Sequence, residues 1–117
     1  MSYAVLFPGQ GSQNKDMLEP YLKDPIFSGI LEQSSQILGY NIIAAVEDES
    51  KLNNTLYTQP IMVAVTYAMW CVWREKSPDL PSYAAGHSLG EYSALVANGF
   101  ISLEDCLNLV VIRAKSM

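Results

Sequence analysis

Gly86-His87-Ser88-Leu89-Gly90 is the stretch that decides the fold, because a G-x-S-x-G spacing coincides with a change from strand-like to helix-like sequence. Tyr83-Ala84-Ala85 predicts a short strand before it, while residues 91–97 have helical composition and Gly99 is a suitable stop. In a nucleophile elbow, the flanking glycines let the chain turn sharply, so the serine hydroxyl projects at the strand's carboxyl end. The stretch therefore predicts an α/β fold with Ser88 as a candidate nucleophile. The alternative is a glycine-rich turn that only packs a helix closely on a sheet.

A second strand is predicted at the start of the chain. The run from Met1 to Phe7 is compact and apolar, which is typical of a buried parallel strand, and the loop Pro8-Gly9-Gln10-Gly11-Ser12-Gln13 follows it. Ligands of open α/β sheets bind outside the carboxyl ends of the strands, where this loop and Ser88 would meet. We therefore expect the backbone amides of Gln10 and Leu89 to form an oxyanion hole, unless the glycines only shape a tight turn.

The remaining segments predict three further helices, over Pro25 to Gly39, about residues 58–76, and Leu103 to the end. Asp24 is a suitable N-cap for the first helix, Pro60 is expected to open the second, and Ser102 is expected to cap the third. Between the first two, residues 40–55 predict a short apolar turn and a solvated acidic loop at Glu47-Asp48-Glu49. This order fits part of a doubly wound parallel sheet, although two strands alone do not make a stable open sheet.

Composition excludes several classes of protein. The 117 residues suggest at most one domain, half of them are apolar, and the net charge of −5 with seven scattered Lys and Arg argues against nucleic acid as a partner. Cys71 and Cys106 have no second ligand at zinc spacing, and as two thiols in apolar segments they favour a reducing, cytoplasmic location. No signal peptide is recognisable, and the longest uncharged apolar run, residues 61–73, is too short to span a bilayer.

The constellation lacks an obvious general base. A serine nucleophile needs one within hydrogen-bond reach, usually a histidine, and His87 is the only histidine of the chain. Its side chain should leave the strand on the side opposite to Ser88, so we expect His87 to be buried beneath the elbow as a structural support. If Ser88 is catalytic, the base comes from residues outside these 117 or from another chain. The chain also stops at Lys115-Ser116-Met117 without a helix stop signal, which indicates truncation and leaves self-association at the sheet edges open.

Arg113 lies among apolar residues of the last predicted helix, where an unpaired cation would be costly. Two interpretations stay open for it. It forms an ion pair with a core carboxylate or bonds to helix-end carbonyls, or its guanidinium grips a substrate carboxylate through two parallel hydrogen bonds. Both interpretations require a well-placed partner.

Four blocks of the sequence occur in an order that covers nearly the whole chain. They are Phe7-Pro8-Gly9-Gln10-Gly11-Ser12-Gln13, Tyr57-Thr58-Gln59-Pro60, Gly86-His87-Ser88-Leu89-Gly90-Glu91-Tyr92-Ser93-Ala94-Leu95, and Arg113. Together they resemble the N-terminal part of the malonyl-CoA:acyl carrier protein transacylase family, which includes the acyltransferase modules of fatty-acid and polyketide synthases. The resemblance implies that residues 1–117 are the N-terminal segment of an acyltransferase catalytic domain, built on an α/β-hydrolase-like, doubly wound parallel sheet with flanking helices.

The resemblance also implies a function in fatty acid biosynthesis and roles for particular residues. Ser88 would take malonyl from coenzyme A and pass it to the phosphopantetheine thiol of acyl carrier protein, with no bound cofactor. Arg113 matches the arginine that pairs with the malonyl carboxylate, Gln10 and Leu89 match the oxyanion-hole residues, and Gln59 matches a position near the substrate pocket.

The family's base histidine and its ferredoxin-like subdomain lie downstream of the matched part, so we expect the 117-residue chain alone to be inactive. Two alternatives are kept beside the transacylase. One is a serine thioesterase or other α/β-hydrolase, and the other is a non-catalytic fragment that retains the elbow. A carboxylate clamp at Arg113 favours the transacylase, because a hydrolase of neutral acyl groups gains nothing from it.

Overall fold

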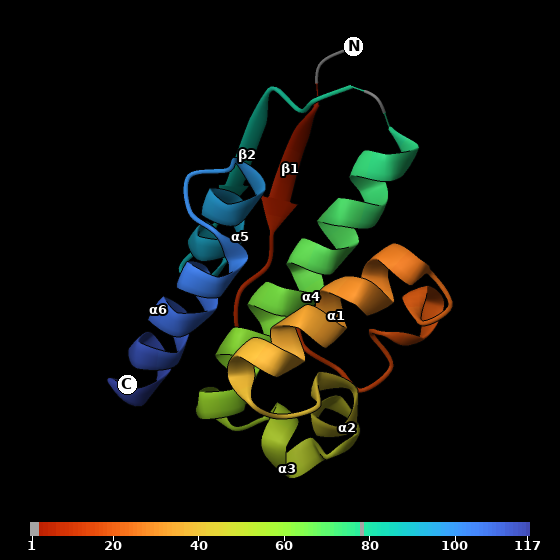
Figure 1. The fold of residues 1–117 in the computed structure, drawn as a ribbon. Helices are drawn as coiled ribbons and strands as arrows, with labels where there is room; N and C mark the ends of the chain where they lie inside the picture. Colours follow the sequence, from red (N-terminus) through yellow and green to blue (C-terminus); the bar gives the residue numbers. More distant parts are fainter. Residues whose placement is uncertain (1–2, 78) are drawn as a thin grey trace.

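The structure is a computed structural model that describes residues 3–77 and 79–117. Two strands lie side by side, and helices pack against them on one face (Figure 1). The prediction of an α/β fold is confirmed. The strands are β1 (Ala4–Phe7) and β2 (Tyr83–Gly86), and the helical segments are η1 (Glu19–Tyr21), α1 (Pro25–Leu38), α2 (Ile42–Glu47), α3 (Glu49–Leu52), α4 (Thr55–Lys76), α5 (Gly90–Ala97) and α6 (Leu103–Lys115).

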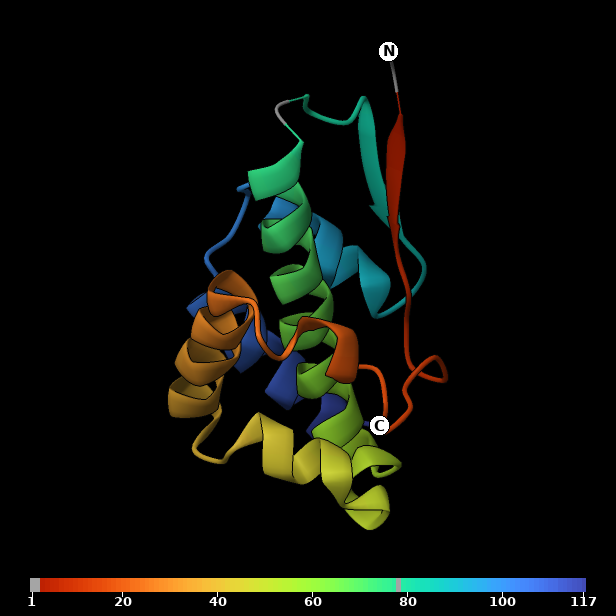
Figure 2. The ribbon, with the colours of Figure 1, turned by 90° about the vertical axis from the view of Figure 1, so that its right-hand side faces the viewer.

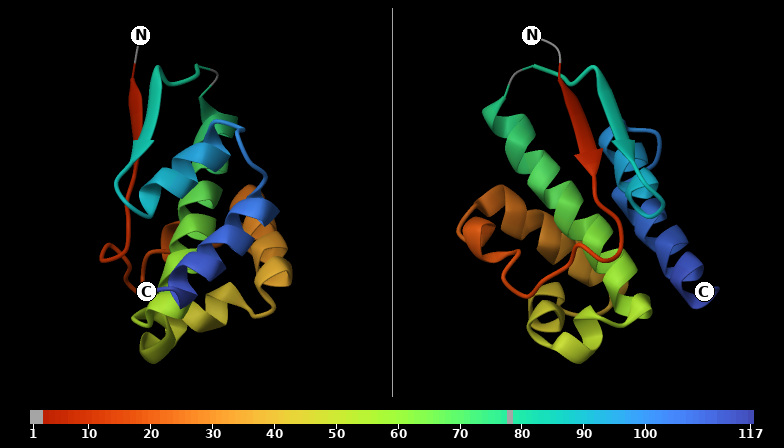
Figure 3. Two further views of the ribbon diagram at one scale, coloured as in Figure 1. Left: turned by 90° about the vertical axis from the view of Figure 1, so that its left-hand side faces the viewer. Right: turned by 180° about the vertical axis from the view of Figure 1, so that it is seen from behind.

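The two strands form a parallel sheet, paired in register from Ala4 with Tyr83 to Phe7 with Gly86. Figures 2 and 3 show this sheet at one side of the molecule, with helices behind one of its faces only. The first strand was expected to be buried, and this is wrong: Phe7 is buried, but Leu6 keeps 76% of its surface exposed. The helices that these residues form cover one face of the sheet, so alternate side chains of β1 remain uncovered. Met1 and Ser2, which the prediction included, lie outside the described residues.

Helix α4 is the centre of the core. Residues 58–66 are buried on every side of it, where α1, α5 and α6 pack around the helix. The expected start at Pro60 is wrong, because the helix begins at Thr55 under a cap in which Asn54 Oδ1 accepts from the Leu56 amide at 3.0 Å. Pro60 therefore lies in the second turn, where its missing N–H leaves the Leu56 carbonyl without a helical donor.

The other helix ends follow their local sequence closely. Asp24 caps α1 by accepting from the amides of Ile26 and Phe27, and Gly39 ends the helix with a φ of 83°. Ser102 Oγ accepts from the Asp105 amide at 3.1 Å at the start of α6. These three predictions are confirmed. The capping residues determine where α1 begins and ends and where α6 begins.

The segment between α1 and α4 is more helical than expected. The predicted turn and acidic loop form α2 and α3, with the carboxylate of Asp48 accepting from the Ser50 amide at 3.0 Å as the cap of α3. The Ser50 hydroxyl bonds the same carboxylate and lowers the pKa of Asp48. Ile42, Val46 and Leu52 are buried beneath these helices. The three acidic residues led to the prediction of a loop, but they lie on the solvent side of these two short helices.

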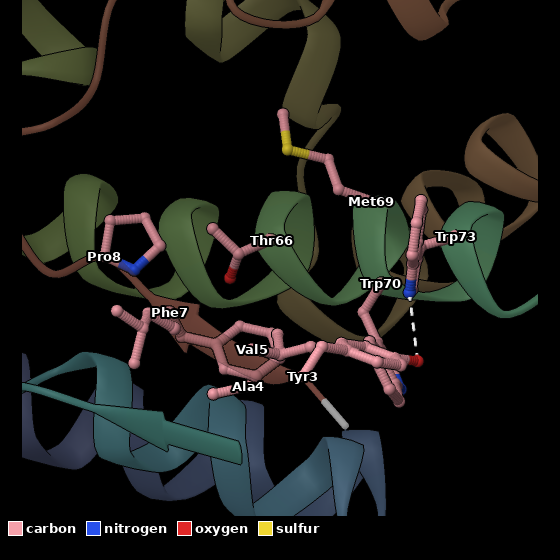
Figure 4. A pocket seen from close by; sticks show the side chains of 10 residues that line it. Tyr3, Ala4, Val5, Phe7, Pro8, Thr66, Met69, Trp70 and Trp73 are labelled. Atoms are coloured by element: carbon pink, nitrogen blue, oxygen red, sulfur yellow. Dashed lines mark hydrogen bonds between the residues drawn. The ribbon is translucent and has the colours of Figure 1, made fainter. Parts of the chain in front are cut away.

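An apolar groove runs along the edge of β1 that faces away from β2. It encloses about 370 Å³ between β1 and α4, and its lining includes Val5, Phe7, Met69, Trp70 and Trp73 (Figure 4). Trp73 Nε1 donates to the Tyr3 hydroxyl at 3.3 Å across one end of the groove. None of the elbow residues lines it, so this groove is separate from the surroundings of Ser88. No helix of the described residues is long and apolar enough to cross a membrane.

Candidate active site

Ser88 occupies the turn between β2 and α5, and its backbone has the strained conformation expected of an elbow. Its φ of 57° makes Ser88 the one non-glycine residue with positive φ among those described. An L-residue in this region is uncommon and costs energy, and such strain gathers at functional sites. The Ser88 side chain is exposed at the carboxyl end of β2. The turn therefore leaves Ser88 accessible to solvent at the end of the sheet.

The two glycines of the elbow are required by close backbone approach. A Cβ on Gly86 would lie 2.1 Å from the carbonyl carbon of Gly90, and a Cβ on Gly90 would lie 2.2 Å from the carbonyl oxygen of Phe7. Real side chains do not tolerate such distances, so the start of α5 can rest on β1 and β2 only if both positions lack a side chain. The spacing of the motif thus has a mechanical cause in this chain.

Arg113 reaches Ser88 from α6. Its Nη2 donates to Ser88 Oγ at 2.9 Å, and its Cζ lies 5.7 Å from the ring centroid of Tyr92. In the described part of the chain, Arg113 has no carboxylate within 4.0 Å, so the ion pair with a core carboxylate, one of the two interpretations left open, is not formed here. The guanidinium keeps its positive charge beside the hydroxyl, in a position where an anion bound at Ser88 would meet it.

Gln59 joins the same group from α4. Its side chain is fully buried, and Oε1 accepts from Arg113 Nη1 at 2.5 Å. Its Nε2 donates to Met117 Sδ at 3.0 Å. Sulfur is a weak acceptor, so the contact with Arg113 is the stronger of the two. The structure therefore brings together three predicted site residues from α4, α6 and the elbow.

The loop after β1 lies against the elbow, as its position in a parallel sheet requires. A Cβ on Gly9 would be 3.1 Å from the carbonyl oxygen of His87, and the side chain of Gln10 donates from Nε2 to Thr55 Oγ1 at 2.8 Å. Within the described residues, the backbone amides of Gln10 and Leu89 donate to no other group. Both amides thus lack an acceptor among the described residues, which is a condition that the predicted oxyanion hole must meet.

His87 differs from its prediction. It is exposed rather than buried beneath the elbow. Tyr83 and Ala85 of β2 are exposed as well, and His87 continues this alternation onto the face of the sheet that the helices leave uncovered. In the described residues no hydrogen bond joins its imidazole to Ser88. The expected support by a buried histidine is wrong for this chain, and the close contacts of Gly86 and Gly90 hold the elbow instead.

The two cysteines lie away from Ser88 in apolar surroundings. Burial raises the pKa of the Cys106 thiol to about 11, and burial also raises the pKa of Cys71. Both thiols are free and protonated at neutral pH, which makes them poor nucleophiles. Among the described residues, no three His, Cys, Asp or Glu side chains are grouped to hold a metal ion. Ser88 thus stays the candidate nucleophile among the described residues.

Two contacts around the site escaped the sequence analysis. Tyr92 places its ring against Arg113, and the hydroxyls of Thr66 and Ser93 lie 3.1 Å apart where α4 meets α5. Tyr92 lies in the first turn of α5, directly after the turn at Ser88, and that place in the sequence could have indicated a neighbour of the site. The pairing of Thr66 with Ser93 depends on how two helices pack, and no local signal reports it.

Comparison with known proteins gives one family and a consistent set of relatives. Residues 5–117 match the family described as the acyl transferase domain. The malonyl CoA-acyl carrier protein transacylase of Haemophilus influenzae is 44% identical over 119 residues, which cover 98% of this chain and 38% of that protein. The enzyme of the same name from Escherichia coli K12 is 40% identical over 118 residues, with the same two shares. The chain thus spans about 38% of the length of these curated relatives.

Solved structures agree with the sequence matches. An acyl-carrier-protein S-malonyltransferase from Burkholderia pseudomallei superposes with a TM-score of 0.96 at 42% identity, covering 100% of this chain and 39% of that chain. A malonyl-transacylase solved in complex with its type II polyketide acyl-carrier protein gives a TM-score of 0.93 at 43% identity, covering 98% and 38%. The fold of this chain is therefore that of a part of such proteins.

Proposed function

Because the chain belongs to the acyl transferase domain family, we propose that it carries the nucleophile of a malonyl-CoA:acyl carrier protein transacylase that acts in fatty acid biosynthesis. Ser88 takes malonyl from coenzyme A and passes it to the phosphopantetheine thiol of an acyl carrier protein. The relatives named for this reaction, and the relative solved with its carrier protein, support the choice of both substrates. The reaction needs no resident cofactor, because the coenzyme A thioester is itself the activated acyl donor.

Two half-reactions make up the transfer. Ser88 Oγ attacks the thioester carbon while a base removes the hydroxyl proton, and the carbonyl oxygen becomes an oxyanion that the amides of Gln10 and Leu89 can bind. The C–S bond then breaks, and coenzyme A leaves as a thiol after it receives the proton. In the second half, the carrier thiol attacks the Ser88 ester and the serine hydroxyl is restored.

The contact between Arg113 and Ser88 is the observation that carries the proposal. A cation 2.9 Å from the nucleophile, with no carboxylate partner among the described residues, suits an acyl group that bears its own carboxylate. The same cation offers nothing to an uncharged acyl group. Malonyl is such a group, since one methylene separates its free carboxylate from the carbonyl that Ser88 attacks.

The base is proposed to come from outside these 117 residues. His87 is the only histidine, and its exposed side chain makes no hydrogen bond with Ser88 in the described structure. Residues 1–117 would then be the N-terminal segment of an incomplete catalytic domain, inactive by themselves. The two free cysteines suit a reducing compartment such as the cytoplasm.

A covalent adduct provides the test. The complete polypeptide that contains these residues is incubated with malonyl-CoA, and intact-mass and peptide mass spectrometry should place one malonyl group on Ser88. Addition of an acyl carrier protein that bears phosphopantetheine should then discharge the adduct onto the carrier. Release of the acyl group to water instead of to the carrier would indicate a thioesterase, and absence of any adduct would refute a catalytic Ser88.

Substitution of Arg113 tests the choice of acyl group. Arg113→Ala should lower acylation of Ser88 by malonyl-CoA about 100-fold, because a charged hydrogen bond in a partly dry site is lost, and should leave acylation by acetyl-CoA within about threefold. Arg74→Ala is the matched control, since Arg74 lies at the far end of α4 and bonds to the Ser77 carbonyl. Equal losses with both thioesters would contradict the role of Arg113 as a carboxylate clamp.

A further inference from the structure

Arg113 is held from two directions by groups that carry no charge. Gln59 Oε1 accepts from Nη1 at 2.5 Å, and the centroid of the Tyr92 ring lies 5.7 Å from Cζ. The remaining bonded end, Nη2, points at Ser88 Oγ. A planar guanidinium fixed at one edge and supported by an aromatic ring has little freedom to turn. These contacts determine which edge of Arg113 faces the acyl group on Ser88.

The acceptor at Gln59 could have been a carboxylate, but it is an amide. An arginine that is withdrawn from water, as the half-buried Arg113 is, commonly pairs with an acid, and a glutamate at position 59 would fit nearly the same volume and keep the bond to Nη1. Such a pair would cancel the positive charge of Arg113, and a substrate carboxylate would then meet a second anion at the site. The amide satisfies the donor and leaves the charge intact.

We propose that Gln59 is a positioning residue that sets acyl specificity, because it fixes Arg113 through a neutral acceptor and so keeps the guanidinium positive toward the acyl carboxylate. This inference rests on the proposed function above. It differs from direct binding of substrate by Gln59, because the side-chain oxygen of Gln59 is already occupied by Arg113 and its side chain is fully buried. Gln59 acts on the substrate through Arg113.

The test is Gln59→Glu in the complete polypeptide, with acylation of Ser88 measured against both malonyl-CoA and acetyl-CoA. We expect kcat/KM for malonyl-CoA to fall about 10- to 100-fold, chiefly through a higher KM, and the value for acetyl-CoA to stay within about threefold. Gln33→Glu makes the same chemical change on the exposed face of α1 and should alter neither value. Retained acylation by acetyl-CoA also reports that the Gln59→Glu protein is folded.

Gln59→Met serves as the second variant, in case a carboxylate at this position prevents folding. It keeps the volume, introduces no charge and removes the acceptor for Nη1. We therefore expect the KM for malonyl-CoA to rise several-fold, while the KM for acetyl-CoA stays unchanged. An unchanged ratio of malonyl to acetyl acylation in either folded variant would overturn the inference and leave the proposed function standing. A lack of malonyl adduct in the unsubstituted protein would overturn both.

Discussion

The helical part of the molecule and its sheet differ in how completely they are closed. Phe27, Leu31, Ile61 and Leu107 of the helical part are buried to within about 1% of their surface. In the sheet, by contrast, Leu6 is 76% and Tyr83 is 74% exposed. Helices of this length can bury one another, whereas a two-stranded parallel sheet needs cover on both faces. The helical core of the described residues is thus fully buried, whereas one face of the sheet is exposed.

The candidate site lies where these two parts meet. Ser88 and the Gly9–Gln10 loop follow the strands, while Gln59 and Arg113 come from α4 and α6 of the closed part. The residues proposed to select the acyl group are therefore held by a completed core. The residues proposed to do the chemistry stand at the open sheet, where a base is still required. This difference agrees with the proposal that the chain holds the residues that select the acyl group but is inactive by itself.

The strongest test of the comparison replaces one leucine in each part. Leu107→Ala should destabilise the protein by about 2–5 kcal/mol, because it leaves a cavity in a closed core. Leu6→Ala should cost less than about 0.5 kcal/mol in the 117-residue chain at concentrations where it is monomeric, because most of that side chain is then in water. Urea denaturation followed by circular dichroism measures both. Equal losses would show that the open face of the sheet is already covered.

The same pair sharpens the comparison when it is made in the complete polypeptide. If further chain covers the outer face of the sheet, Leu6→Ala should there cost about 1 kcal/mol or more, while the effect of Leu107→Ala stays the same. A cost for Leu6→Ala that remains near zero in both proteins would mean that this face of the sheet is solvated in the complete polypeptide as well.

A second prediction concerns the junction between the two parts. Gly86→Ala should destabilise the complete polypeptide by about 1–3 kcal/mol and abolish the malonyl adduct, because its Cβ would force α5 away from the sheet. Gly29→Ala is the matched control, since a Cβ there meets nothing within 4 Å in the helix α1. It should stabilise the protein by about 0.5–1 kcal/mol. Thermal unfolding and mass spectrometry measure the two outcomes, and a Gly86→Ala protein with normal adduct would contradict the mechanical account of the elbow.

The sequence predicted those features that depend on a few adjacent residues. The sharp turn at Ser88, the cap at Asp24 and the end of α1 at Gly39 each follow from local backbone chemistry, and each is found. The start of α4 was misplaced because proline favours the first turn of a helix, whereas the cap at Asn54 puts Pro60 in the second turn. Local signals thus located the turns better than they located the full lengths of the helices.

Features that depend on packing were only partly predictable. The family resemblance implied that Gln59 and Arg113 belong to one site, but their hydrogen bond spans 54 positions and follows from the docking of α6 on α4. The prediction that His87 is buried was wrong for the same reason, because the exposure of this residue depends on which face of the sheet the helices cover. Side-chain partners across helices are set by the assembled core rather than by spacing along the chain.

The smallest expected effect concerns association of the 117-residue chain with itself. The unpaired edge of β1 and the exposed Leu6 and Tyr83 form an apolar surface of the kind through which strands pair between molecules. We expect the isolated chain to associate in a concentration-dependent manner in sedimentation velocity experiments. Leu6→Lys should weaken this association about tenfold, because a charge would be brought against the apposed face.

Leu22→Lys provides the comparison for the helical part, because Leu22 is 40% exposed there and lies away from the sheet. It should leave the association unchanged, and circular dichroism should show that both variants keep the helix content of the unsubstituted chain. Equal weakening by both lysines would mean that association depends on net charge and is not directed by the open sheet. A monomeric chain at all concentrations would mean that the two-stranded sheet tolerates its exposed face, and the contrast between the two parts would then lie in catalysis alone.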